Sequence, residues 1–200
     1  MKILAVADIH GAQYRLNLVL KNIQRYSPDL VVICGDITQF GPGELAKNFL
    51  DQIPVETLAI TGNIDTADVS QGIDDSKALN IEMKRVVKKG ITFVGISGAI
   101  LKQSKNFEEK KLLAGTNVLV SHEPPHGSQD KIFLGMHTGS KELKEIVEKY
   151  KPRLLLCGHI HEDPGFTQIN QTTVVNCSLG KRGEGALIYI NENLSVKMLD

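Results

Sequence analysis

Residues 2–8, KILAVAD, and residues 30–36, LVVICGD, are short apolar runs that each end on an aspartate. Between them, YRLNLVLKNIQRY (14–26) repeats its apolar residues at helical spacing. A second helical segment, GELAKNFLDQI (43–53), leads to a third apolar run, VETLAITGN (55–63). Near-continuous apolar strands joined by helices are typical of a parallel sheet buried on both faces. This βαβαβ stretch therefore predicts an α/β fold.

Strands dominate the chain from Ile91 onward. They are predicted in TNVLVSH (116–122), RLLLCGH (153–159), TTVVN (172–176) and a hairpin-like pair, ALIYINENLSVKML (186–199). One helix interrupts them, with Ser140 as its N-cap and Pro152 as its stop. The second half therefore predicts another sheet packed on the first. Residues 66–90 are polar with few apolar anchors, and we expect a long connection there.

Length and charge limit the classes of function. A chain of 200 residues is predicted to form a single domain, residues 1–200, with a substantial core. Its 23 basic and 23 acidic residues give no electrostatic case for nucleic acid or an anionic membrane. The first ten residues read as a strand rather than a signal peptide, and no stretch approaches the roughly 20 apolar residues of a membrane span. We therefore expect a cytoplasmic protein without a membrane partner.

The three cysteines, Cys34, Cys157 and Cys177, are odd in number and lack the CxxC spacing. Most of them lie in apolar runs. A disulfide framework or a cysteine zinc site is therefore not expected, and these side chains are predicted to be buried in strands.

Polar side chains gather where the apolar strands end. In chain order they are Asp8, His10, Asp36, Asn63, Asp65, His122, His159 and His161. The carboxyl ends of parallel strands form one edge of a sheet, where ligands bind in α/β folds. We therefore expect five strand ends to converge on one site. A single histidine or aspartate at a strand end is more often a cap, but four of the six histidines fall in these blocks.

The residue types at this edge predict a metal site. Imidazole, carboxylate and carboxamide ligands without thiolate suit Mn, Fe, Ni or Zn. Seven of the residues above, all except Asp65, are candidate ligands, which is too many for one tetrahedral ion. Two ions roughly 3.5 to 4 Å apart would use them all. We expect two divalent ions, with manganese as the first choice and iron, nickel or zinc as alternatives.

Spacing supports the same interpretation. Residues i and i+2 point to the same side of an extended segment, which is the spacing of Asp8 with His10 and of His159 with His161. A glycine also precedes three of the candidates, at positions 35, 62 and 158. Without a Cβ, glycine allows the backbone to turn sharply and to approach a ligand closely.

The ordered blocks DxH, GD, GNxD, H and GHxH, from Asp8 to His161, resemble the calcineurin-like metallophosphoesterase superfamily. The stretch from SHEPPHGSQD through MHTGS to CGHIHE further resembles its Icc-related phosphoesterase branch. The resemblance implies a four-layer αββα sandwich of two mixed β-sheets flanked by helices. It also implies that one metal is held by Asp8, His10 and His161, the other by Asn63, His122 and His159, with Asp36 as the bridge.

The resemblance implies hydrolysis of a small-molecule phosphoester by a hydroxide that bridges the two metals. The candidate catalytic residues are then Asp36, Asn63, Asp65 and His122. At the position of Ile64 the family usually has a histidine, which acts as general acid on the leaving oxygen or binds the substrate phosphate. A missing general acid typically costs about 10²- to 10⁴-fold. Either the leaving group needs little protonation, or His126 or His137 serves it, or the protein has lost catalysis.

Three functions stay open at this stage. A metal-dependent phosphoesterase, with a phosphodiester as the favoured substrate, explains why all seven ligands are present. A non-catalytic scaffold of the same fold, as in the retromer subunit, would have no need of them. A nuclease is disfavoured by the neutral charge. The oligomeric state is left open, and a homo-oligomer is allowed.

Overall fold

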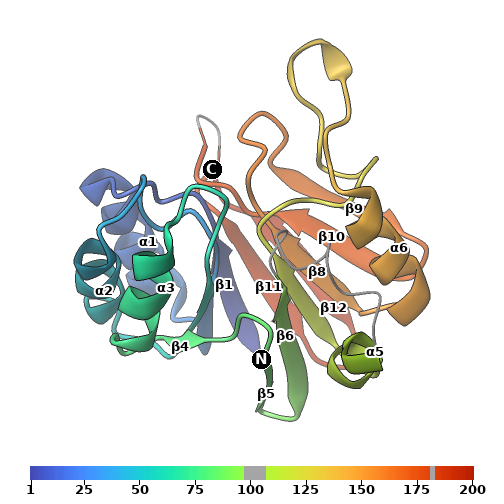
Figure 1. The fold of residues 1–200 in the computed structure, drawn as a ribbon, viewed down its shortest axis with the longest axis horizontal. Helices are drawn as coiled ribbons and strands as arrows, with labels where there is room; N and C mark the ends of the chain where they lie inside the picture. The colour runs from blue at the N-terminus through green and yellow to red at the C-terminus, as the bar shows by residue number, and fades with distance from the viewer. Residues whose placement is uncertain (97–106, 181–182) are drawn as a thin grey trace.

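Two six-stranded mixed sheets pack face to face in the computed structural model of the chain (Figure 1). The structure describes residues 1–96, 107–180 and 183–200. The strands of the first sheet are, in spatial order, β12 (Leu194–Met198), β11 (Ala186–Ile190), β1 (Lys2–Val6), β2 (Leu30–Cys34), β3 (Thr57–Ile60) and β4 (Leu79–Asn80). Those of the second are β5 (Arg85–Lys88), β6 (Ile91–Ile96), β7 (Val118–Ser121), β8 (Leu154–Cys157), β10 (Thr172–Asn176) and β9 (Gly165–Ile169).

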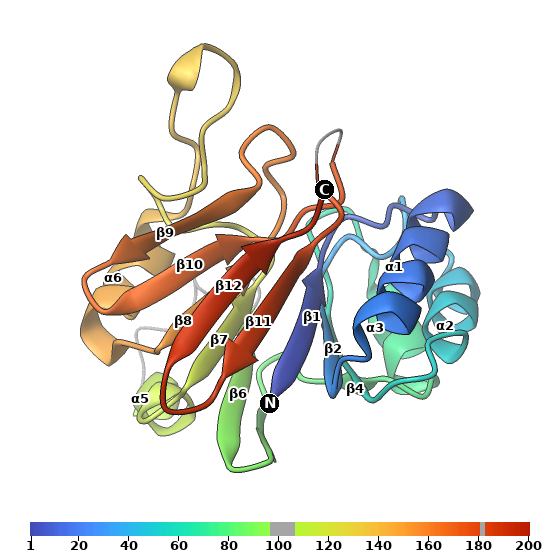
Figure 2. The ribbon, with the colours of Figure 1, turned by 180° about the vertical axis from the view of Figure 1, so that it is seen from behind.

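Helices cover the two outer faces (Figure 1). The first sheet carries α1 (Gln13–Tyr26), α2 (Gly43–Asp51) and α3 (Ala67–Asp74), and the second carries α5 (Phe107–Leu113) and α6 (Lys141–Tyr150). A short 3₁₀ turn, η1 (Phe133–Gly135), lies in the loop between β7 and α6. The view from behind shows the same arrangement, with the sheets between the two groups of helices (Figure 2).

Alternation along the central strands explains why both faces of each sheet are buried. In β1, Leu4 and Val6 pack toward the helices, whereas Ile3 and Ala5 pack between the sheets. A third apolar cluster fills the space between the second sheet and its helices. Three apolar layers separate four layers of secondary structure. The predicted four-layer αββα sandwich is therefore confirmed.

The final hairpin lies in the first sheet, which corrects the prediction that it belongs to the second. β11 pairs antiparallel with β1, with Ile3 opposite Ile188, and β12 pairs with β11. Local periodicity identifies a strand but not its neighbour. The free edge of β1 accepts the hairpin because Ile188 and Ile190 can then be buried between the sheets.

The segment 66–90 is structured rather than a bare connection. It contains α3, β4 and β5, which link the two sheets. Val69 and Ile73 are the apolar anchors of α3 and are fully buried. Another helix, α5, precedes β7, where the sequence indicated only a solvated helical face in the charge run EEKK (108–111). Short amphipathic segments with one or two anchors give a weak periodic signal, which is why neither segment was predicted as a packed element.

The predicted ends of α6 are confirmed. The Ser140 hydroxyl accepts a hydrogen bond from the Leu143 N–H at 3.1 Å, which satisfies one free donor of the first turn. Lys151 then adopts a left-handed conformation at φ 51°, one residue before Pro152. The helix places its apolar face on the second sheet.

The cysteines are free and buried, as predicted. Cys34 and Cys157 end strands, and Cys177 follows β10. Burial raises the pKa of the Cys34 and Cys157 thiols well above the ordinary value. Within the described ranges, no helix has the length and apolarity needed to cross a membrane.

Candidate metal centre

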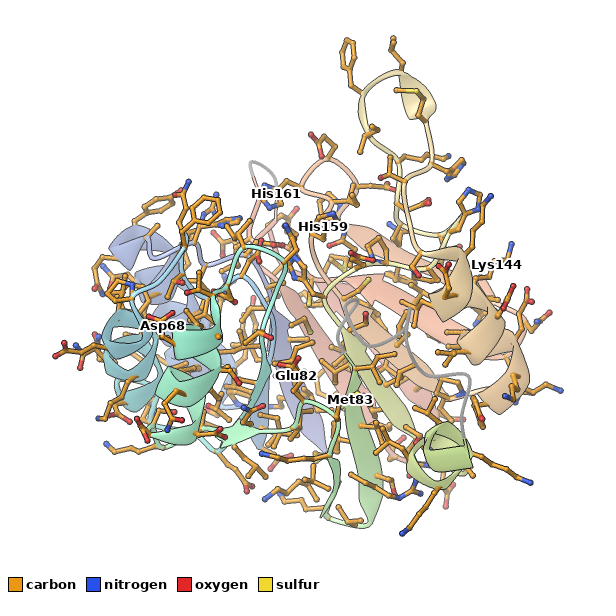
Figure 3. All side chains as sticks on the ribbon, in the orientation of Figure 1. Asp68, Glu82, Met83, Lys144, His159 and His161 are labelled. Atoms are coloured by element: carbon orange, nitrogen blue, oxygen red, sulfur yellow. The ribbon has the colours of Figure 1, made fainter. Side chains whose placement is uncertain are left out.

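The carboxyl ends of five parallel strands meet at one edge of the sandwich. Asp8 follows β1, Asp36 follows β2, Asn63 follows β3 and His122 follows β7. His159 and His161 follow β8 and lie together at the upper edge in Figure 3. The predicted convergence of the strand ends is therefore observed.

The backbone at these strand ends is left-handed rather than extended. Asp8, His10, Asp36 and His159 have φ values of 64°, 54°, 50° and 69°. Non-glycine residues rarely adopt this region, and they do so mainly where surrounding contacts hold them. The DxH and GHxH pairs were predicted to share one side of an extended segment. That explanation was wrong, because no extended strand continues through either block. The turns instead direct each side chain separately.

The glycines that precede three candidates permit close approach, as predicted. A Cβ on Gly62 would overlap the Asp36 carboxylate. One on Gly158 would lie 2.8 Å from the Asp8 Oδ2 atom, and one on Gly35, at φ +89°, would lie 2.7 Å from the Cα of Gly62. The carboxylates are therefore buried directly against neighbouring backbone.

Asp8, His10 and His161 form one cluster. The two Nε2 atoms of His10 and His161 are 3.2 Å apart. The Oδ1 atom of Asp8 lies 3.5 Å from Nε2 of His161 and 4.0 Å from Nε2 of His10. Asp8 is fully buried, and its carboxylate also accepts the His159 N–H at 3.1 Å. Three ligand atoms thus face a common point.

A second cluster centres on Nε2 of His122. This atom lies 2.8 Å from Oδ1 of Asn63, 3.2 Å from Nδ1 of His159 and 3.4 Å from Oδ2 of Asp36. The other ring nitrogen of His122 donates to the Cys34 carbonyl at 2.8 Å. That hydrogen bond fixes the orientation of the ring, so that Nε2 points toward the cluster. This is the usual arrangement of a metal-binding histidine.

The two clusters share their carboxylates. Oδ2 of Asp36 lies between His122 and His10, 4.0 Å from Nδ1 of the latter. Two groups in the described part of the chain could hold a metal, namely Asp8 with His10 and His161, and Asp8 with Asp36 and His122. In each group the ligand atoms lie within 4.8 Å of one another. Both aspartates therefore lie where a bridging carboxylate is needed.

In each cluster the pKa of one histidine is raised and that of the other is lowered. Burial opposes charge on His122, but the Asp36 hydrogen bond and the Asp8 carboxylate outweigh it and raise its pKa to about 9. The hydrogen bond with Asp8 likewise raises the pKa of His161. Burial lowers the pKa of His10 and of His159. Each close imidazole pair thus joins one ring whose pKa is raised to one whose pKa is lowered.

The donor set fits divalent cations. Two buried carboxylates, four imidazoles and an amide oxygen converge, and positive charge is already favoured there because the carboxylates raise two histidine pKa values. Burial opposes ionisation of Asp8, yet its hydrogen bond with His161 and the charge of His122 lower its pKa. A bound cation would compete with protons for these imidazoles and keep the carboxylates paired.

Asp65 does not face the clusters. Its Oδ1 accepts the N–H and the hydroxyl of Thr38 at 2.9 and 3.0 Å. Its Oδ2 accepts the N–H of Ile37 and of Gly62, both at 3.0 Å. These contacts join the loops that carry Asp36 and Asn63. Asp65 therefore positions two candidate ligands through the backbone.

Sequence reasoning missed Arg15. Its Nη1 donates to the Asp8 carbonyl at 2.5 Å, so a permanent cation lies at the same edge. Its positive charge also acts on His10 and His161. The available signal was position, because Arg15 lies in the first turn of α1, directly after the DxH block.

His126 and His137 lie in the loop after β7 and take part in none of the metal-ligand contacts above. Nδ1 of His137 bonds to Oδ1 of Asp130 at 2.5 Å, and the two imidazole centroids are 5.8 Å apart. Asp130 is fully buried and also accepts the N–H of Gly127 and of Gly139. His137 is thus held by a structural carboxylate, a contact that sequence spacing did not reveal.

A four-layer αββα sandwich with carboxylates and imidazoles at the strand ends defines a metallophosphoesterase. The chain belongs to the calcineurin-like phosphoesterase family, whose model matches residues 1–163. The members of this family use divalent metals.

Two curated proteins are similar to this chain. MJ1162 of Methanocaldococcus jannaschii, described as an uncharacterized protein, is 34% identical over 199 residues, covering 89% of this chain and 88% of the relative. A probable glycerophosphodiester phosphodiesterase, GpdQ of Arcobacter nitrofigilis, is 30% identical over 181 residues, covering 77% of this chain and 64% of the relative.

Solved structures share the fold. TT1561 of Thermus thermophilus has a TM-score of 0.73 at 16% identity, with 98% of each chain covered. A novel archaeal phosphodiesterase has a TM-score of 0.60 at 14% identity, with 100% of each chain covered. At these identities the likeness concerns the fold alone.

Proposed function

We propose that the protein is a phosphodiesterase that depends on two divalent ions, with Mn²⁺ as the first choice. The observation that carries the proposal is the pair of clusters joined by shared buried carboxylates. Asp8, His10 and His161 would hold one ion, and Asn63, His122 and His159 the other, with Asp36 between them. When bound, two such ions would activate water near neutral pH and neutralise charge on the phosphoryl oxygens.

The surrounding residues hold this ligand set in place. The Cys34 carbonyl orients His122, Asp65 fixes the loops of Asp36 and Asn63, and the Ile64 N–H donates to Oδ1 of Asp36 at 3.2 Å. Arg15 adds a cation beside the Asp8 strand end. Such supporting contacts limit reorganisation when a negatively charged substrate enters.

Ile64 favours a diester over a monoester. An isoleucine side chain cannot donate a proton or a hydrogen bond to a phosphoryl group. A diester has one ionisable phosphoryl oxygen fewer than a monoester, so it needs fewer donors beyond the cations. The name of the GpdQ relative, a probable glycerophosphodiester phosphodiesterase, agrees with this substrate class.

The decisive experiment combines metal analysis with a phosphoester panel. Protein stripped of metal and reloaded with Mn²⁺, Ni²⁺, Fe²⁺ or Zn²⁺ should bind two ions per chain and hydrolyse an aryl phosphodiester faster than the matching monoester. The Asp36→Asn variant should fall to the level of the metal-free protein. Asp29→Asn is the matched control, because Asp29 lies at the other end of β2 in an exposed ion pair with Lys89.

Two outcomes would overturn the proposal. Protein that binds two ions but hydrolyses neither ester would support the scaffold function instead. Activity confined to oligonucleotides would support the nuclease.

A further inference from the structure

Exposed apolar side chains are concentrated at the edge that carries the metal clusters. The described part of the chain exposes nine large apolar side chains. Six of them form what we call the apolar rim: Tyr14, Phe40, Phe133, Leu134, Met136 and Phe166. The other three are Leu79, Val87 and Tyr189.

Topology places the rim beside the metal clusters. Tyr14 is in the first turn of α1, directly after β1, and Phe40 lies in the loop after β2. Phe166 pairs with Val175, near the carboxyl end of β10. The three remaining rim residues lie in the loop that starts at the carboxyl end of β7. The rim therefore extends over both sheets at one edge.

The three exposed apolar residues outside the rim lie at the opposite edge. Leu79 pairs with Leu58 near the start of β3, Val87 pairs with Thr92 near the start of β6, and Tyr189 pairs with Lys2 at the start of β1. They come from separate strands.

The most exposed part of the rim is a finger formed by residues 131–137. Lys131 and His137 pair at its base, and the Ile132 N–H donates to the Met136 carbonyl at 2.9 Å. Phe133 and Leu134, at its tip, are 80% and 82% exposed. The finger rises away from the sandwich (Figures 1 and 2), and side chains at its end point outward (Figure 3).

Hydrogen bonds hold the base of the finger next to the metal clusters. Asp163, two residues after His161, accepts the Lys131 N–H at 3.0 Å, and its carbonyl accepts the Gln129 amide at 3.0 Å. The buried Asp130 carboxylate also accepts hydrogen bonds from the N–H groups of Gly127 and Gly139 in the same loop. The tip is therefore presented by a fixed support rather than by a slack loop.

We propose that the apolar rim rests on a lipid surface, with the tip of the finger inserted, so that the metal clusters act on a phosphodiester carried by a lipid. The substrate part of this inference rests on the proposed function. A convex apolar finger can bury its side chains by inserting into a lipid layer of any shape, whereas a protein partner would need a pocket that matches the finger. Burial of each tip side chain supplies enough free energy for about a tenfold or larger change in partitioning.

Charge indicates the kind of lipid surface. The balance of 23 basic and 23 acidic residues was the basis for expecting no membrane partner, but it argues only against attraction to an anionic membrane. The proposal therefore replaces that expectation for an uncharged lipid surface. Apolar insertion needs no such attraction. Binding should therefore occur on zwitterionic vesicles and should change little with salt.

A second copy of the chain fits the rim less well. The three exposed apolar residues at the opposite edge are scattered and, within the described residues, form no apolar receptor. One surface hollow, between α2 and α3, has three acidic residues and a lysine in its lining, namely Glu44, Asp68, Asp75 and Lys47. Two copies that met rim to rim would cover the metal clusters of both.

A tryptophan reporter tests the insertion directly, because the chain contains no tryptophan. In Phe133→Trp, fluorescence should shift to the blue on phosphatidylcholine vesicles and be quenched by brominated lipid, with little effect of salt. Val87→Trp is the matched control, since Val87 is 62% exposed at the opposite edge. Its spectrum should not change. The measurement needs neither metal nor substrate.

Two results would overturn the proposal. The first is a reporter at position 133 that responds to vesicles no more than the one at position 87. The second is an emission shift that occurs without vesicles as protein concentration rises, in which case a second copy covers the rim.

Activity separates this inference from the proposed function. Leu134→Ser should partition onto vesicles about tenfold more weakly and lose a similar factor on a phosphodiester lipid in vesicles. It should keep its rate on a soluble aryl phosphodiester. Val87→Ser should leave all three quantities unchanged. If the parent protein and both variants fail to hydrolyse the soluble diester, the proposed function is contradicted. If Leu134→Ser and Val87→Ser lose vesicle binding and activity on the lipid substrate equally, the lipid surface is contradicted.

Discussion

Asp65 binds Thr38 twice, through the backbone N–H and through the hydroxyl, with one carboxylate oxygen. Its other oxygen accepts the N–H of Ile37 and of Gly62. One carboxylate thus joins the loop after β2 to the loop after β3. These loops carry Asp36 and Asn63, so the geometry of two candidate ligands depends on a residue that touches neither cluster.

Asp65→Asn should weaken both the fold and the metal site. An amide offers one oxygen where four donors require two, so the free energy of unfolding should fall by about 1–3 kcal/mol. Metal affinity should fall by about 10- to 100-fold, as for other residues that support ligands. Urea unfolding and metal titration measure the two effects. Asp74→Asn, in an exposed ion pair with Lys84, should change neither, and equal behaviour of the two variants would contradict the positioning role.

Ile64→His should raise monoester hydrolysis relative to diester hydrolysis. An imidazole at this position could donate to a monoester oxygen or to a poor leaving group. The carboxylate of Asp65 is already bound by four donors, so the new ring would lack that partner and the gain should stay below about 10²-fold. The ratio of kcat/KM for paired aryl monoester and diester substrates gives the result. An unchanged ratio would show that position 64 does not contact the phosphoryl group.

Metal affinity should rise with pH up to the pKa of His122. The Asp36 and Asp8 carboxylates raise that pKa to about 9, so below it a proton competes with the cation. Affinity at this half-site should therefore increase by up to about tenfold per pH unit and level off above the pKa. Calorimetry in buffers of different ionisation enthalpy should detect the proton released on binding. No release near neutral pH would contradict this expectation.

The raised pKa of His122 also predicts how the stability of the metal-free protein depends on pH. The folded-state pKa of His122 lies above the ordinary value of 6.5. Its contribution to stability is therefore complete below about pH 6.5 and is lost as pH rises through about 9. In His122→Ala without metal, the fall in the free energy of unfolding over this window should be smaller than in the parent protein.

His137 is the stronger candidate for the proton donor that Ile64 lacks, because the Asp130 carboxylate holds its ring. His137→Ala should lower turnover of a diester with a poor leaving group by about 10²-fold and leave an activated aryl diester nearly unaffected. His126→Ala serves as the comparison in the same loop. If neither variant shows a selective loss, both histidines are removed as candidates and the leaving group departs without protonation.

Local sequence patterns were sufficient to predict the α/β class and the gathering of candidate metal ligands at one edge of the fold. Apolar runs that end on Asp8, Asp36 and Asn63 needed only local periodicity and the rule that parallel strands share one edge. The ends of α6 were equally local, because Ser140 caps its first turn and Pro152 follows it.

The neighbours of each strand, and the side chains that meet, depend on the packed fold. β11 could pair beside β1 because burial of Ile188 between the sheets decides the partner, and that information is absent from local periodicity. The division of His159 and His161 between two clusters follows from a left-handed turn. The exposure of Phe133 at the edge that carries the metal clusters also could not be predicted from the sequence, because only the packed fold decides which apolar side chains remain uncovered.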